Sequence, residues 1–176
     1  VWSSRGLGDV YKRQANTLIT EEGGIFAEST DGPGFLKDLY VKEIDLNKKN
    51  ILILGAGGVV PSIVYSLLSM GCKKIFLSNR TIEKAENIKK KFNEVEILKW
   101  GEIPDFDIVI NATSVGLKGD SLDLEFNVKD KIFYDVIYNP KETQFLKKAK
   151  QELLRIVFWN ISYSPPLFLC SDFCRT

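Results

Sequence analysis

The chain has 176 residues, of which 44% are hydrophobic, and a formal net charge of +1 at pH 7. This length and apolar content are enough for one domain plus part of another, and the near-neutral charge gives no reason to expect a nucleic-acid partner. Because no apolar run approaches the roughly 20 residues of a membrane span and residues 1–6 lack the apolar core of a secretion signal, we expect a cytoplasmic protein with no membrane partner.

The first predicted element is a β-hairpin. Residues 16–19 and 25–28 are strand-like, and they flank a turn over residues 21–24 that contains two glycines. A hairpin of this size is marginally stable in isolation. After it, Thr30 and Asp31 are typical of a helix N-terminus and predict a helix over residues 34–40.

From Lys49 onward, apolar strands alternate with amphipathic helices, which is typical of an α/β fold. We predict a doubly wound, Rossmann-like parallel sheet with helices on both faces and with the ligand site at the carboxyl ends of the strands. Residues 100–105 are too few for a further helix. The predicted strands cover 50–54, 74–78, 94–98, 106–112, 131–136 and 155–159, and the predicted helices cover 59–70, 82–92 and 143–154.

A glycine-rich turn, Gly55-Ala56-Gly57-Gly58, joins the first of these strands to its helix. Glycines in this position let the backbone turn tightly and approach a pyrophosphate, which the free amides of the helix N-terminus then bind. The turn therefore predicts a dinucleotide site. The alternative is a tight strand-to-helix turn without a ligand.

The second strand ends in Asn79-Arg80-Thr81, where an NAD-binding unit usually places an acidic residue on the ribose 2′-hydroxyl. A neutral Asn followed by Arg suits a 2′-phosphate, so the sequence favours NADP over NAD. Lys84 lies about one helical turn further on and is close enough in sequence to contact the same phosphate. It is equally typical of a solvated helix face.

The cysteines and the lack of histidine limit which metal sites and acid–base groups the chain can provide. The three cysteines match neither a disulfide framework nor a zinc-finger spacing, and the chain has no histidine. We therefore expect no metal, and we expect acid–base chemistry to fall to Lys, Asp, Glu, Tyr or Cys.

Six motifs in order resemble those of the shikimate dehydrogenases. They occupy residues 16–18, 29–35, 55–58, 79–81, 111–117 and 135–140, and the resemblance covers roughly residues 15–161. It implies NADP-dependent reduction of 3-dehydroshikimate to shikimate, a step of chorismate and aromatic amino acid biosynthesis, with a small-molecule substrate.

The resemblance also implies roles for single residues. Asn16 and Tyr138 would bind substrate, and Asp31 would contact a substrate hydroxyl and partner a catalytic lysine. Without the resemblance, Asn16 is better explained as an ordinary strand start and Asp31 as a helix N-cap. For Tyr138 the alternative is a turn aromatic. The cofactor would be held by Gly55, Ala56, Gly57, Gly58, Val59, Asn79, Arg80, Thr81, Lys84, Thr113, Ser114 and Val136.

The chain departs from the family's pattern at both ends. The family places a substrate domain with a Ser-x-Ser motif and the catalytic lysine before Asn16, where only fifteen residues stand here, and no glutamine follows Gln151. We expect a foreign or disordered segment over 1–14, a remnant of the substrate domain with a linker helix over 15–45, the NADP-binding domain over 46–161 and an atypical tail over 162–176. Such a fragment would bind NADP(H) weakly or moderately and turn over little or no substrate.

Two alternatives stay open at this stage. The chain is also compatible with an NADP-binding module without catalysis, and with a dehydrogenase acting on quinate or another cyclic hydroxy acid. The sequence predicts no oligomeric state.

Overall fold

The structure is a computed structural model, and it describes residues 2–4, 17–21, 24–126, 129–151 and 155–158. The side chains are described only within residues 29–126 and 129–150. Asn16, most of the predicted 1–14 segment and all of the predicted 162–176 tail lie outside these residues.

Six parallel strands form the main sheet, in the order β6-β5-β4-β7-β8-β9. The chain runs from β4 outward to β6 and returns beside β4 as β7, so the strand order reverses between β4 and β7. Ligands of doubly wound folds bind at the carboxyl ends of the strands at this reversal. The strands are β4 (Asn50–Leu54), β5 (Lys74–Ser78), β6 (Val95–Leu98), β7 (Ile108–Asn111), β8 (Ile132–Asp135) and β9 (Arg155–Phe158).

The predicted α/β fold is confirmed, and the strand predictions are correct to within two residues at each end. The helices following the glycine turn and β5 are shorter than predicted, and the segment between β6 and β7 contains no helix. The helices in the described part of the chain are α2 (Asp31–Val41), α3 (Val60–Ser69), α4 (Ile82–Lys89) and α5 (Gln144–Gln151).

The strands bury both of their faces, because successive residues point to opposite sides of the sheet. Ile51 and Ile53 of β4 pack with residues of α2, α3 and α4, whereas Leu52 and Leu54 pack with residues of α5 and of the segment over 115–126. The near-continuous apolar runs read from the sequence follow from this two-sided burial.

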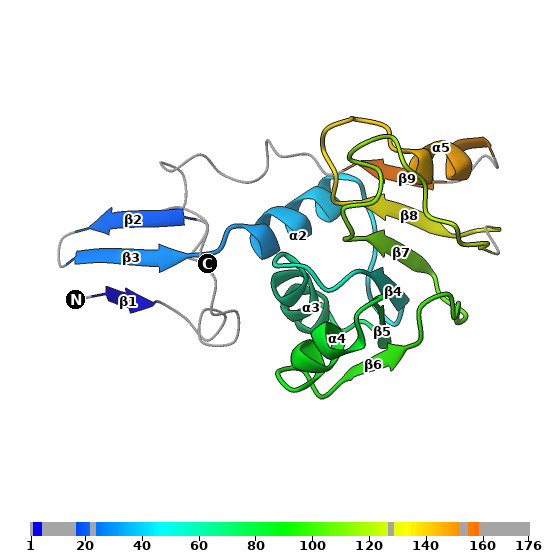
Figure 1. The fold of residues 1–176 in the computed structure, drawn as a ribbon. Coiled ribbons are helices and arrows are strands. Elements are labelled where there is room, and N and C mark those ends of the chain that lie inside the picture. The colour runs from blue at the N-terminus through cyan, green and yellow to red at the C-terminus, as the bar shows by residue number, and fades with distance from the viewer. Residues whose placement is uncertain (1, 5–16, 22–23, 127–128, 152–154, 159–176) are drawn as a thin grey trace.

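A second, three-stranded sheet precedes α2 (Figure 1). β2 (Thr17–Glu21) and β3 (Gly24–Glu28) are antiparallel, with Glu21 opposite Gly24, so the predicted hairpin is confirmed. The sequence did not predict the third strand, β1 (Trp2–Ser4), which pairs in parallel with β3. Three residues without an alternating pattern are too short a signal for a strand prediction.

Helix α2 leads from this small sheet to the main one and packs against α3 (Figure 1). A Cβ atom on Gly32 would lie 2.6 Å from Ser66 Oγ of α3, and the hydroxyls of Ser29 and Ser62 are 3.2 Å apart. Small residues therefore let the two helices approach closely.

The same helix is fixed to the sheet by a buried polar contact. Asp38 is fully buried, accepts a 2.8 Å hydrogen bond from the Tyr134 hydroxyl of β8 and pairs with Lys42. Burial and the neighbouring Asp38 carboxylate raise the pKa of Tyr134 far above its usual value. Within the described part of the chain, no helix is both long and apolar enough to cross a bilayer.

Candidate dinucleotide site

The glycine turn after β4 takes a conformation that requires glycine at its first position. Gly55 has a φ of 103°, and a Cβ atom there would lie 2.6 Å from the carbonyl oxygen of Ala112. The Gly55 amide also donates a 2.8 Å hydrogen bond to the carbonyl of Ser78. The turn is thus held between the ends of the two neighbouring strands, β5 and β7.

Helix α3 begins directly after this turn, as predicted. Gly57 and Gly58 are exposed, Pro61 occupies the first turn of the helix, and that turn carries no acidic side chain. Proline fits this position because the first amides of a helix have no intrahelical acceptor. The positive end of the helix dipole is therefore open to an anion.

The basic motif stands at the end of the adjacent strand. β4 and β5 pair with Leu54 opposite Ser78, so Asn79 and Arg80 follow at the edge where the glycine turn begins. The Asn79 side-chain amide donates a 2.6 Å hydrogen bond to the carbonyl of Thr81, which is the N-cap residue of α4. Arg80, Thr81 and Lys84 are all exposed. The two predicted phosphate-binding motifs thus lie at the same edge of the sheet.

A buried hydrogen-bond network begins at the last residues of β7 and β8, Asn111 and Asp135. The Asn111 side-chain amide is 3.2 Å from both carboxylate oxygens of Asp135, and its carbonyl oxygen accepts from the amide and the hydroxyl of Thr113 at 3.1 and 2.7 Å. The Thr113 hydroxyl in turn accepts from the amide of Val115 at 3.1 Å. These bonds fix the bend of residues 111–115.

Asp135 connects this bend to the next two segments. Its carboxylate accepts a 2.9 Å hydrogen bond from the Ile137 amide and a 2.5 Å bond from the Thr143 hydroxyl. Burial raises the pKa of Asp135 above its ordinary value, and the bonds from Thr143, Ile137 and Asn111 oppose that shift. One carboxylate therefore positions the loops after both strands.

These loops and the glycine turn enclose a cleft of about 530 Å³. Seven predicted site residues line it: Gly57, Gly58, Val59, Thr113, Ser114, Val136 and Tyr138. Four residues that the sequence analysis did not single out also line it: Ala112, Leu117, Ile137 and Asn139. All four lie within the motifs at 111–117 and 135–140. Membership of these motifs was therefore the sequence signal that could have identified them as lining residues.

The chemistry of the cleft wall is that of a binding site. Among its lining residues in the described part of the chain, Tyr138 alone carries a titratable side chain, and it is 58% exposed. Leu117, which is 53% exposed, adds apolar surface at the rim. The wall combines backbone amides, hydroxyls and apolar side chains, which suits a planar ring joined to phosphates.

The remaining predicted residues lie elsewhere. Gly55 and Ala56 form the turn behind the cleft, and the Asn79–Lys84 motif stands beside it without lining it. Asp31 is half-buried and is the first residue of α2, whereas Thr30 occupies the N-cap position, so the alternative reading of Asp31 as an N-cap was wrong by one residue.

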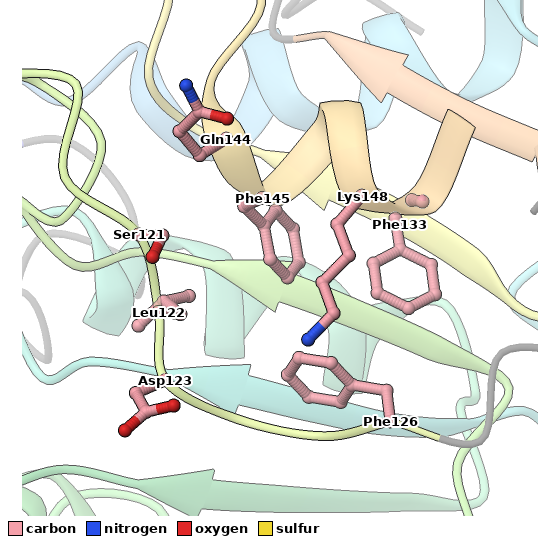
Figure 2. Close-up of a pocket in the computed structure, with 9 residues that line it drawn as sticks. Ser121, Leu122, Asp123, Phe126, Phe133, Gln144, Phe145 and Lys148 are labelled. Carbon is pink, nitrogen blue, oxygen red and sulfur yellow. The ribbon is translucent and has the colours of Figure 1, made fainter. Parts of the chain in front are cut away.

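A smaller cavity of about 150 Å³ lies on the face of the sheet covered by α5, between α5 and the segment over 121–126 (Figure 2). Phe126, Phe133 and Phe145 form its wall, and the Lys148 ammonium donates to the carbonyl of Leu124 at 3.2 Å. None of the predicted site residues lines it. It is therefore separate from the cleft.

Known proteins resemble this chain in sequence and in fold. The model of the family "Shikimate / quinate 5-dehydrogenase" matches residues 38–117. A shikimate dehydrogenase (NADP(+)) of Pelagibacter ubique (strain HTCC1062) is 50% identical over 142 residues, which are 79% of this chain and 54% of that protein. The chain thus spans about half the length of this curated relative.

Solved structures of shikimate dehydrogenases also resemble this chain. Shikimate dehydrogenase from Aquifex aeolicus aligns with a TM-score of 0.78 and 36% identity over 89% of this chain and 60% of that one. The Thermus thermophilus enzyme, solved in complex with NADP(H) and shikimate, aligns with a TM-score of 0.77 and 28% identity over 88% of this chain and 59% of that one.

Proposed function

We propose that this chain, which is 50% identical to a shikimate dehydrogenase over 79% of its own length, belongs to the shikimate / quinate 5-dehydrogenase family. It would be the NADP-binding part of an enzyme that reduces 3-dehydroshikimate to shikimate. The observation that carries the proposal is the cleft, where the glycine turn meets the loops after β7 and β8. These three segments are far apart in sequence, and each contains one of the motifs that carried the resemblance.

In the proposed reaction, bound NADPH supplies the hydride that reduces the substrate carbonyl. The amides at the start of α3 bind the pyrophosphate, and Arg80 with Lys84 binds the 2′-phosphate. Thr113, Ser114 and Val136 line the part of the cleft that receives the rest of the cofactor. The chain's contribution is therefore to bind and orient the cofactor and to exclude water from one of its sides.

Among the described residues that line the cleft, none carries an amino or carboxyl group, so a lysine that protonates the reduced oxygen is not one of them. We propose that Tyr138 and Asp31 contact the substrate and that Asp31 orients the lysine donor known from the family. Asn16 remains a predicted substrate ligand, and the cytoplasmic location and the four predicted segments of the chain also remain predictions.

The test is a calorimetric titration of the 176-residue chain with NADPH and with NADH. The proposal predicts saturable binding of NADPH and clearly weaker binding of NADH, because the latter lacks the phosphate that Arg80 would contact. Failure to bind either nucleotide would contradict it. A second measurement distinguishes the two substrates in the family's name. Shikimate or quinate is added to the NADP⁺-loaded chain, and the compound that binds raises the unfolding temperature above that of the chain with NADP⁺ alone.

A further inference from the structure

A tight turn follows β6 and carries Trp100. The carbonyl oxygen of Lys99 accepts a hydrogen bond from the Glu102 amide at 3.1 Å, and the Glu102 carboxylate accepts from the Lys99 amide at 3.3 Å. Gly101 has a φ of 92°, as expected for the third residue of a turn that needs glycine there. These bonds fix the backbone on both sides of Trp100.

The same turn is tied to the end of β5. The buried Ser78 hydroxyl donates a 3.1 Å hydrogen bond to the Lys99 carbonyl, so the residue before Trp100 is fixed to the strand that carries Arg80 two positions later. The half-buried indole also packs against the apolar cluster beneath β5 and β6. Trp100 is therefore a rigid platform beside the Asn79–Thr81 motif.

Arg80 lies over this platform. Its guanidinium carbon is 5.9 Å from the centroid of the Trp100 ring, within the range of a cation–π contact. The Asn79 bond to the Thr81 carbonyl fixes the bend from which Arg80 extends. Without the indole, an exposed arginine samples many rotamers, and ordering it on binding opposes affinity.

We propose that Trp100 is a positioning residue for cofactor selection, holding the Arg80 guanidinium where the 2′-phosphate of NADP binds. This inference rests on the proposed function. Trp100 does not line the cleft and belongs to none of the motifs that carried the resemblance. Its effect reaches the nucleotide through Arg80, so it is specific for the phosphate that distinguishes NADP from NAD.

The experiment compares NADP⁺ and NAD⁺ binding to the full chain by calorimetry. Trp100→Leu is expected to weaken NADP⁺ binding about two- to fivefold, the size of an exposed cation–π contact, and to leave NAD⁺ binding unchanged. Trp100→Phe, which keeps an aromatic face, should restore part of the loss. In an Arg80→Ala background, Trp100→Leu should have no further effect on NADP⁺ binding.

A matched control separates positioning from packing. Ile103 is also half-buried and packs against the same apolar cluster, but it follows the turn and does not stack on Arg80. Ile103→Ala should lower the unfolding temperature and leave the ratio of NADP⁺ to NAD⁺ affinity unchanged.

The outcomes are distinguishable. If the wild-type chain prefers NADP⁺ and Trp100→Leu weakens both nucleotides equally, or still weakens NADP⁺ binding when Arg80 is alanine, the positioning role is refuted and the proposed function stands. If the wild-type chain binds neither nucleotide, the proposed function fails and this inference fails with it.

Discussion

Two halves of the same sheet edge are built in different ways. The phosphate half, residues 55–59 and 79–84, consists of backbone amides and exposed side chains, with Arg80, Thr81 and Lys84 at the surface. The Asp135 network, formed by Asn111, Thr113, Asp135 and Thr143, consists of side-chain hydrogen bonds that are mostly buried. From this difference we expect substitutions of the exposed side chains in the phosphate half to change cofactor affinity with little effect on the stability of the fold. Substitutions in the Asp135 network should change both the stability of the fold and the shape of the cleft.

The largest expected effect is at the centre of the network. Asp135→Ala removes an acceptor from Asn111, Ile137 and Thr143 at once. The Asn111 amide keeps its 3.3 Å bond to the Val115 carbonyl, but the buried Ile137 amide and Thr143 hydroxyl lose their acceptor, at a cost of about 3 kcal/mol or more. Urea denaturation measures the loss. Arg80→Ala, in the other half, is the control and should change stability by no more than about 1 kcal/mol, the size of its exposed contact with Trp100. Equal stabilities for the two variants would remove the contrast between the halves.

Gly55→Ala tests the backbone part of the phosphate half. A Cβ atom at a φ of 103° and 2.6 Å from the Ala112 oxygen forces the turn to move, at a cost of about 1–3 kcal/mol. Because the moved amides would contact the pyrophosphate that both cofactors share, NADPH and NADH binding should weaken together.

Gly71→Ala is the matched control for this variant. Gly71 also has a positive φ, of 71°, but a Cβ atom there would meet nothing within 4 Å. We expect some loss of stability and unchanged NADPH binding. If Gly71→Ala weakened binding as much as Gly55→Ala, general destabilisation would explain both results.

The exposed cations should act on NADPH alone. Arg80→Ala removes a charge-assisted contact to the 2′-phosphate and should weaken NADPH binding about tenfold or more, with NADH binding unchanged. Lys84→Ala should have a smaller effect of the same kind, since a lysine contributes a point charge without the planar fork of arginine. Titration calorimetry of each variant measures its affinities for NADPH and NADH. If a variant loses the same affinity for both nucleotides, the replaced residue does not recognise the 2′-phosphate.

The smallest expected effect is on pH dependence. The raised pKa of Asp135 means that the folded chain holds this proton more tightly than the unfolded chain. Its contribution to the free energy of unfolding therefore falls as pH rises from about 3.9, the ordinary value, through the raised one, by at most about 1.4 kcal/mol per unit. Denaturation across this range should show the free energy of unfolding of the wild type falling relative to that of Asp135→Asn as pH rises, because the other carboxyl groups titrate in both proteins.

The sequence predicted the parts of this molecule that depend on local pattern. The apolar strands of the main sheet, the glycine turn and the hairpin each have a signal within a few residues, and the strand–turn–helix order placed Gly55–Val59 at the ligand edge. Contacts between distant residues were not predictable from one sequence. Asn111 and Asp135 were recognised within their motifs, but their pairing, the close approach of Gly32 to Ser66 and the stacking of Arg80 on Trp100 depend on strand order and register.

The most direct test of the account is a titration of the ¹⁵N-labelled chain with NADP⁺, followed by backbone amide NMR. We expect the largest shift changes over 55–59, 79–84, 111–117 and 136–139, and little change at Phe126 and Phe145 around the separate cavity. Saturable changes confined to that cavity, or none at the glycine turn, would contradict the claim that the cleft at the carboxyl ends of β4, β7 and β8 binds the cofactor.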